Sequence, residues 1–194
     1  MDGKFMNYDV FMAGFGGQGI LLIGNLLAYA AILEGKNASY FPAYGPEKRG
    51  GAATCTVIVS EDEIGSPVVG RPGNALILNQ VAMDKYFAAV KSGGRVILNS
   101  SLIEDGQFLR NDLEVLRIPA NQLAMAVGNV RLLNMIMLGA FNERSGIVSL
   151  ETLKRALDEV IPERNRNFIP ANIQALDCGA AFAREASLRL KSCP

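Results

Sequence analysis

The stretch MAGFGGQGILL, residues 12–22, constrains the fold more than any other part of this sequence. It follows a short β-rich run, Tyr8 to Ala13, and leads into an apolar stretch with helical periodicity from about Gln18 to Glu34. A strand, a glycine-rich turn and a helix in this order open many dinucleotide-binding α/β domains. The amides at the start of the helix would face an anion, and so would the positive end of its dipole. Gly35 then stands where a left-handed helix C-cap is expected.

Short strand patterns alternate with helical patterns along the rest of the chain. Strands are expected at Asn37–Phe41, Ala52–Ser60, Pro67–Val69, Ala75–Asn79, Arg95–Asn99 and Glu114–Ile118. Helices are expected at Gln80–Val90, Asn121–Val127, Asn129–Phe141, Leu150–Val160 and Ala171–Leu188, with an irregular basic loop at Arg164–Pro170. The alternation predicts an α/β fold with a Rossmann-like three-layer sheet, mainly parallel, and a helical C-terminal part. No repeat or linker divides the sequence, so we expect a single domain over residues 1–194.

Charge and composition narrow the functional classes. Lys and Arg number 19 and Asp and Glu number 19, which argues against nucleic acid as a principal partner. The sequence carries no secretion signal and no apolar stretch long enough to span a bilayer comfortably, so we expect a cytoplasmic protein without a membrane partner. Cys55, Cys178 and Cys193 lie too far apart for a zinc or iron–sulfur motif, and we interpret them as buried or incidental thiols.

The absence of histidine is the most useful negative observation. It excludes Ser-His-Asp and Cys-His catalysis, HExxH zinc sites and histidine general bases together. We therefore predict no catalytic residue and no metal site in this chain. The composition fits a scaffold or a cofactor holder better than a self-sufficient catalyst.

The glycine loop does not match an ordinary dinucleotide site. Gly14 would permit a tight turn, Gly16 a close ligand approach and Gly19 close packing of the helix on the strand. An NAD site usually has an acidic residue at the end of the second strand, and NASYFPAY ends without one. A P-loop is excluded because Ile20 and Leu21 follow Gly19. A tight strand-to-helix crossover without a ligand remains the alternative.

A second loop, YGPEKRGG at residues 44–51, offers several ligand-binding groups. These are the aromatic face of Tyr44, the carboxylate of Glu47, the cations Lys48 and Arg49, and the backbone amides of Gly50 and Gly51. Loops at the carboxyl ends of strands gather over one crevice in a doubly wound sheet, so this loop should neighbour the glycine loop. A solvated charged loop is the simpler alternative.

Several motifs, taken in order, resemble one family. They are GFGGQGI, YGPEKRGG, CTVIVSEDEIGSPVV, GGRVILNSSLI, NMIMLGA, GIVSLETLKRAL and IPERN. The chain is similar over nearly its whole length to the gamma subunit of 2-oxoacid:ferredoxin oxidoreductases. The form YGPE-x-RGG followed by GSPVV looks most like the 2-oxoglutarate branch.

The resemblance implies a subunit of a complex that converts a 2-oxoacid and coenzyme A to acyl-CoA and CO₂. Thiamine diphosphate and iron–sulfur clusters would be held by alpha-, beta- and delta-type partner subunits, and electrons would pass to ferredoxin or another acceptor. This chain would support coenzyme A binding and assembly rather than the thiamine chemistry. The cofactor-binding residues it implies, together with the two loops above, are Gly14, Gly16, Gly17, Gln18, Gly19, Tyr44, Glu47, Arg49, Gly50 and Gly51.

Other interpretations stay open. Arg49 could meet a ligand phosphate or a carboxylate of the alpha subunit, since a planar guanidinium suits both. The chain could instead be an autonomous NAD(P)- or adenosyl-methionine-binding protein, or a purely structural subunit. The apolar helix pattern at Asn129–Phe141 indicates a core helix or a subunit interface. An isolated chain could pair with itself to cover the surface meant for the alpha subunit.

Overall fold

The computed structural model describes residues 8–44, 51–104 and 110–191, without the side chains of Tyr44 and residues 189–191. Its strands are β1 (Tyr8–Phe15), β2 (Asn37–Tyr44), β3 (Ala52–Ser60), β4 (Asn74–Ile77), β5 (Arg95–Asn99) and β6 (Glu114–Ile118). Its α-helices are α1 (Ile20–Leu33), α2 (Gln80–Tyr86), α3 (Ala120–Val127), α4 (Leu133–Ser145), α5 (Leu150–Val160) and α6 (Ile169–Lys191). Three 3₁₀ segments, η1 (Phe87–Ala89), η2 (Val130–Leu132) and η3 (Glu163–Phe168), join them.

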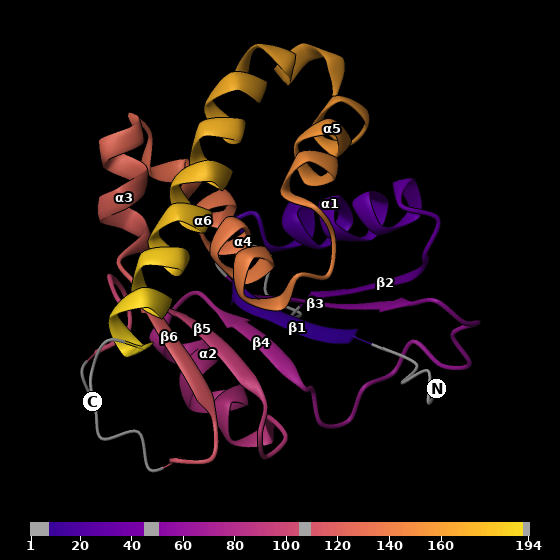
Figure 1. The fold of residues 1–194 in the computed structure, drawn as a ribbon, viewed down its shortest axis with the longest axis vertical. Helices are drawn as coiled ribbons and strands as arrows, with labels where there is room; N and C mark the ends of the chain where they lie inside the picture. The colour runs from indigo at the N-terminus through magenta and orange to yellow at the C-terminus, as the bar shows by residue number, and fades with distance from the viewer. Residues whose placement is uncertain (1–7, 45–50, 105–109, 192–194) are drawn as a thin grey trace.

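The strands form one mixed sheet in the order β2-β3-β1-β4-β5-β6 (Figure 1). The pairs β1–β4, β4–β5 and β5–β6 are parallel, whereas β3 is antiparallel to both of its neighbours. The expected α/β architecture is therefore confirmed, with β3 as an antiparallel insertion. That insertion moves the end of β2 to two strand spacings from β1, about 10 Å instead of about 5 Å.

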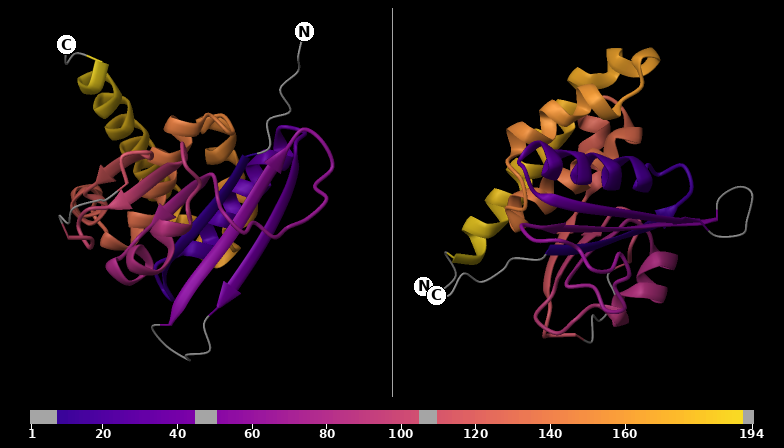
Figure 2. Two further views of the ribbon diagram at one scale, coloured as in Figure 1. Left: turned by 90° about the horizontal axis from the view of Figure 1, so that it is seen from below. Right: turned by 90° about the vertical axis from the view of Figure 1, so that its right-hand side faces the viewer.

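Helices cover both faces of the sheet and give the three expected layers. One face carries α1, α3, α4, α5 and α6, while α2 and η1 pack on the other, as the two further views show (Figure 2). Alternation along β1 explains the division, because Val10 and Met12 point into the first core and Phe11 and Ala13 into the second. Asn79 caps α2, with its Oδ1 2.9 Å from the Ala82 amide. Ser149 caps α5, with its Oγ 3.0 Å from the Thr152 amide.

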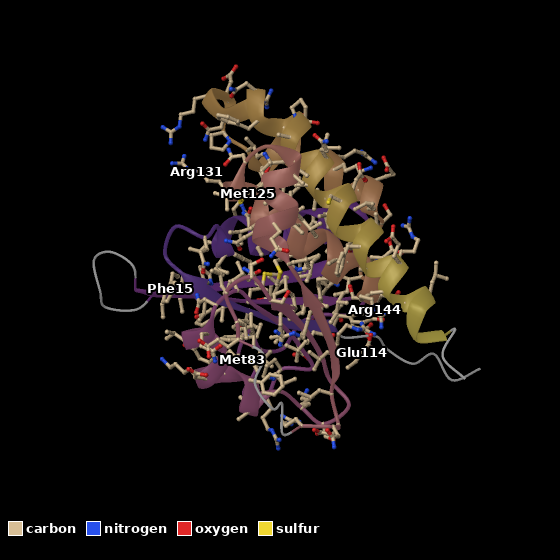
Figure 3. All side chains as sticks on the ribbon, turned by 90° about the vertical axis from the view of Figure 1, so that its left-hand side faces the viewer. Phe15, Met83, Glu114, Met125, Arg131 and Arg144 are labelled. Carbon is tan, nitrogen blue, oxygen red and sulfur yellow. The ribbon has the colours of Figure 1, made fainter. Side chains whose placement is uncertain are left out.

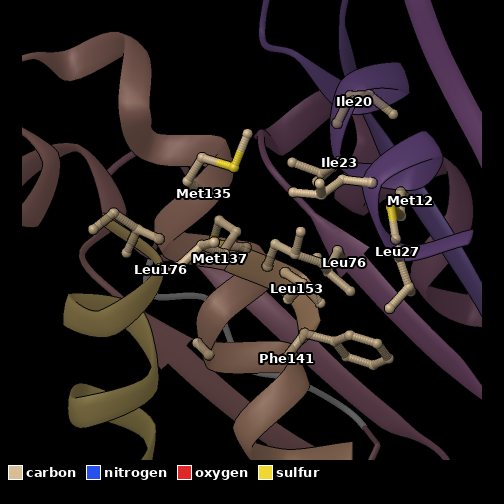
Figure 4. Packing of buried hydrophobic residues seen from close by; sticks show 14 of the residues in the cluster. Met12, Ile20, Ile23, Leu27, Leu76, Met135, Met137, Phe141, Leu153 and Leu176 are labelled. Carbon is tan, nitrogen blue, oxygen red and sulfur yellow. The ribbon is translucent and has the colours of Figure 1, made fainter. Parts of the chain in front are cut away.

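The helix α4 lies at the centre of the larger core. Every residue from Leu133 to Asn142 is buried, and Met135, Met137 and Phe141 are fully buried. Figure 4 shows these side chains meeting apolar residues of β1, α1, α5 and α6. Burying each such side chain contributes roughly 1.5–3 kcal/mol. Of the two interpretations of this helix, the structure supports the core.

Glycine lets α4 and α6 approach until their backbones touch. A Cβ on Gly139 would overlap the carbonyl oxygen of Leu176, and a Cβ on Gly179 would overlap the carbonyl oxygen of Ile136. Backbone atoms cannot turn aside as a flexible side chain can. These two glycines therefore fix the distance between the helices.

Several expected boundaries were wrong. No strand forms at Pro67–Val69, and the expected basic loop is instead η3 followed directly by the first turn of α6. The chain turns at Gly16 and Gly17, Gly19 is the N-cap, and α1 therefore begins at Ile20 instead of about Gln18. The strand β2 continues through Pro42, which is tolerated because β2 is an edge strand. Gly35 does adopt the expected left-handed conformation, with φ 75°.

Candidate functional site

The glycine loop lies at the carboxyl end of β1, where the parallel strands β4, β5 and β6 also end. Gly16 and Gly17 are exposed, and Gly17 has a left-handed φ of 99°. The Gly16 amide donates to the carbonyl oxygen of Gly51 at 2.8 Å. This bond confirms that Gly51, just before β3, neighbours the glycine loop. Tyr44 is the last residue of β2, while Glu47, Arg49 and Gly50 lie outside the described residues.

Two glycines of the loop have roles that differ from those expected. Gly14 does not make the turn, because it is the seventh residue of β1. A Cβ built on Gly14 would lie only 2.6 Å from Gln18 Oε1, so the absence of a side chain there makes room for Gln18. Gly19 is the N-cap of α1, with φ 77°. The space left by its missing Cβ is filled by the side-chain amide of Asn134 from α4, whereas the sequence predicted that Gly19 lets the helix pack closely on the strand. Asn134 Nδ2 donates to the Gly19 carbonyl oxygen at 3.4 Å. Sequence spacing could not reveal Asn134, which lies 115 residues away.

Gln18 holds the loop in place. Its Oε1 accepts hydrogen bonds from the Phe15 amide at 2.7 Å and from Asn79 Nδ2 at 2.9 Å. The same Asn79 caps α2, so one side chain ties the glycine loop to the next helix N-terminus. We therefore assign Gln18 Oε1 a structural role at the border of the site.

Side-chain amides continue across the carboxyl edge of the sheet. Asn99 at the end of β5 donates from Nδ2 to Asn121 Oδ1 at 2.9 Å and to the Leu78 carbonyl oxygen at 3.2 Å. We call Gln18, Asn79, Asn99 and Asn121 the amide row. The Asn99 Oδ1 also accepts a hydrogen bond from the Ser101 amide at 3.2 Å, in the turn that follows β5. Asn79 and Asn121 could have been predicted at this edge from the sequence, since each follows closely after a strand that ends there.

The chemistry of this edge favours binding over proton transfer. Amide side chains and backbone N–H groups do not titrate near neutral pH. No side chain caps the first turn of α1 among the described residues, which leaves its leading amides for an outside acceptor. Cys55 packs beneath α1, and burial raises the pKa of its thiol to about 12, so it is no thiolate nucleophile.

Two further findings concern the described residues as a whole. No group of three or more His, Cys, Asp or Glu side chains there is arranged to hold a metal ion. None of the helices in the described ranges combines the length and the apolar character needed to cross a membrane.

The family model for pyruvate ferredoxin/flavodoxin oxidoreductases matches residues 9–182. The chain belongs to this family. Within it, the chain is 34% identical over 182 residues to the 2-oxoglutarate synthase subunit KorC of Methanocaldococcus jannaschii, covering 93% of this chain and 96% of that one. It is 36% identical over 186 residues to the ketoisovalerate oxidoreductase subunit VorA of Methanothermobacter thermautotrophicus, covering 95% of this chain. The chain spans only 38% of the length of that VorA subunit.

A solved structure agrees with the family assignment. The gamma subunit of the keto/oxoacid ferredoxin oxidoreductase of Geobacter sulfurreducens PCA superposes with a TM-score of 0.79 at 32% identity. The alignment covers 93% of this chain and 98% of that one. Relatives that share this domain are thus named for different 2-oxoacids, ketoisovalerate in one case and 2-oxoglutarate in the other.

Proposed function

We propose that this chain is the gamma subunit of a cytoplasmic 2-oxoacid oxidoreductase complex and that its glycine loop binds the diphosphate of coenzyme A. Family membership supports the first part. The observation that supports the second is the hydrogen bond from the Gly16 amide to the Gly51 carbonyl oxygen, which holds the exposed turn at Gly17 beside the leading backbone amides of α1, where no side chain caps the helix. Such a group of amides binds phosphate without requiring a positively charged side chain.

The ligand we propose needs no acidic residue at the end of β2. An NAD site uses that acid to bind the ribose hydroxyls. Here β2 ends at Tyr44, and β3 separates that end from the glycine loop. In coenzyme A one ribose hydroxyl carries a phosphate group, so a carboxylate at the end of β2 would repel this ligand.

Thiamine diphosphate would supply the decarboxylation chemistry in partner subunits, and iron–sulfur clusters there would carry the electrons to ferredoxin or another acceptor. In this proposal, the residues of the present chain bind and orient coenzyme A, and they attach the domain to an alpha-type subunit. Beta- and delta-type subunits complete the complex. 2-Oxoglutarate is the proposed substrate.

Purification of the tagged chain from its native source tests the assignment. We expect partners that contain thiamine diphosphate and iron–sulfur clusters, together with coenzyme A-dependent oxidation of a 2-oxoacid. The assay should compare 2-oxoglutarate, pyruvate and 2-oxoisovalerate, and we expect the highest kcat/KM with 2-oxoglutarate. Recovery of the chain alone, binding NAD(P) or adenosyl-methionine, would instead support an autonomous binding protein.

Gly16→Ala tests the loop within the active complex. The added methyl group would occupy the surface that the diphosphate approaches, so we expect the KM for coenzyme A to rise about tenfold. The matched control is Gly65→Ala, because Gly65 is also exposed and has no neighbour within 4 Å of a built Cβ. Equal coenzyme A kinetics in both variants would contradict the proposed site and favour a purely structural subunit.

Arg49→Ala addresses the second loop. We expect either a higher KM for coenzyme A or a loss of complex assembly, according to whether the guanidinium meets a phosphate or a partner carboxylate. Size-exclusion chromatography of the purified complex separates the two results. Normal assembly with unchanged coenzyme A kinetics would show that Arg49 has neither role.

A further inference from the structure

Among the described residues, no helix covers one face of the strands β2 and β3. On the helical side of the sheet, every second residue of β3 from Ala53 to Val59 belongs to the larger core. The smaller core on the other side takes residues from β1, β4, β5 and β6, and none from β2 or β3 within the described ranges. In the left view of Figure 2, β2 and β3 lie beside α2 and not behind it. The layer formed by α2 and η1 therefore ends at β1.

Five side chains of β2 and β3 lie on this uncovered surface, because they alternate with residues that face the larger core. We define the open face by these five residues, Ser39, Phe41, Ala43, Thr54 and Thr56. Phe41 is 48% exposed and stands opposite Thr56. Phe11 pairs with Thr56 on its other side and packs on Tyr86 of α2, with ring centroids 4.8 Å apart. The covered part of the sheet thus begins at the strand next to β3.

The connection between β3 and β4 covers only the end of this surface that is remote from the glycine loop. Most of residues 63–71 line a pocket of about 410 Å³ together with Ile58. Ile58 is 8% exposed, whereas Phe41, one row nearer to the glycine loop, is 48% exposed. The part of the open face that adjoins the glycine loop therefore stays accessible.

The open strands do not have the composition of a sheet edge that faces water. Such edges are usually protected by charged side chains, above all Lys. Neither β2 (NASYFPAY) nor β3 (AATCTVIVS) contains one, although β2 is an edge strand. The other edge strand, β6, follows the usual rule: its Glu114 accepts from Arg95 Nε at 3.0 Å and pairs with Arg144, beside which it lies in Figure 3. An uncharged surface with an exposed aromatic ring is typical of the centre of a protein interface.

The area of the open face argues against a second copy of this chain as its partner. The strand β2 has 8 residues and β3 has 9. At about 3.3 Å per residue and about 4.8 Å per strand, the two strands present roughly 250 Å². A stable interface buries about 800 Å² on each partner, so the open face alone is too small to hold a symmetric dimer. Its partner must also contact a neighbouring surface.

The neighbouring surface is the edge of the sheet where we propose that coenzyme A binds. The strand β2 ends at Tyr44 and β3 begins at Ala52, so both lead into the loop at residues 44–51. That loop adjoins the glycine loop, because the Gly51 carbonyl oxygen accepts from the Gly16 amide. Coenzyme A can receive an acyl group only where the subunit that holds thiamine diphosphate reaches this edge. The same subunit can then continue onto the open face.

We propose that the open face docks onto the partner subunit that holds thiamine diphosphate. Phe41 lies at the centre of the contact, next to Thr54 and Thr56. This inference rests on the proposed function, because that function supplies the partner. It adds the surface that attaches the chain, which is the uncovered part of the sheet and not the helical layer.

Photo-crosslinking in the co-expressed complex identifies what covers Phe41. Phe41→p-benzoyl-phenylalanine places a photoreactive ketone on the open face, and irradiation should link this chain to the thiamine diphosphate subunit, as mass spectrometry of the linked peptides would show. The matched control is the same replacement at Ile32, which is 55% exposed on α1 and should give no such link. A link to a second copy of this chain or to another subunit, or no link at all, would overturn the inference.

Phe41→Arg tests whether this contact holds the complex together. A charge at the centre of the interface should weaken the affinity of the chain for its partners at least about tenfold, measured by titration of the tagged chain. Urea denaturation of the isolated variant should match wild type, because Phe41 is half exposed there. Ile32→Arg should leave both measurements unchanged.

The two proposals fail in different ways. If the wild-type chain assembles with a thiamine diphosphate subunit and Phe41→Arg assembles equally well, only the inference about the open face is wrong. If the wild-type chain purifies without such a subunit, the proposed function is wrong as well.

Discussion

Gly179 and Gly16 stand in contrasting surroundings. At Gly179 the neighbouring helix α4 touches α6, so the chain itself requires glycine there. At Gly16 the backbone is exposed, and a built Cβ would meet only the Gly51 carbonyl oxygen at an ordinary 3.6 Å. Packing explains the first glycine and does not explain the second. The helical core and the carboxyl edge should therefore respond oppositely to the same added methyl group.

Gly179→Ala should break the core most severely. Alanine normally favours a helix interior over glycine by about 1 kcal/mol. Here the methyl group would overlap the Ile136 carbonyl oxygen, and such overpacking typically costs 1–3 kcal/mol or more. We expect a net loss of about 2 kcal/mol or more in the free energy of unfolding, measured by urea denaturation. The control Gly65→Ala should stay within about 1 kcal/mol of wild type, and a stabilised Gly179→Ala would disprove the close helix contact.

Gly19→Ala should have the next largest effect, at the boundary between the two regions. Alanine pays about 1–2 kcal/mol for a left-handed φ, and its methyl group would also displace the Asn134 amide. Gly17→Ala is the matched control, because Gly17 shares the left-handed φ but has no neighbour within 4 Å of a built Cβ. We expect Gly19→Ala to cost about 1 kcal/mol more than Gly17→Ala.

A double-mutant cycle isolates the Asn134 contact. In an Asn134→Ala background, the cost of Gly19→Ala should fall toward that of Gly17→Ala, because the displaced amide is gone. Additive costs in the cycle would mean that Asn134 does not limit the space at Gly19.

The carboxylate of Glu34 makes the stability of the helical layer depend on pH. Burial alone would raise the pKa of Glu34, but hydrogen bonds from Lys36, the Ser149 amide and Thr152 outweigh it and lower the pKa from 4.5 to about 2. A lowered pKa means that the stabilisation is present above pH 4.5 and is lost as the pH falls toward 2. Its Oε1 accepts from the Ser149 amide at 2.7 Å, which links the end of α1 to the start of α5.

Glu34→Gln should therefore reduce the free energy of unfolding at pH 7 by about 1–2 kcal/mol, allowing for partial solvent screening. The deficit relative to wild type should shrink between pH 4.5 and pH 2. Denaturation curves at several pH values measure it, with the exposed Glu159→Gln as control. A deficit that does not change with pH would show that the charge of Glu34 is not what matters.

The sequence predicted the local elements better than their arrangement. The bounds of β5 and β6 and the left-handed conformation of Gly35 follow from periodicity and residue type. The insertion of β3 between β2 and β1 does not, since strand order depends on pairing between distant segments. The same holds at the site: the glycine loop was visible as a motif, whereas its contact with Asn134 depends on how α4 packs.

Gly16→Ala is the smallest stability change we expect and the most informative. With no positive φ and no close neighbour, the variant should unfold within about 0.5 kcal/mol of wild type. The proposed function nevertheless requires a higher KM for coenzyme A. A stable variant with weakened coenzyme A binding would show that this glycine serves a ligand rather than the fold. A variant as unstable as Gly179→Ala would show instead that Gly51 leaves no room at the loop, and the contrast between the two regions would disappear.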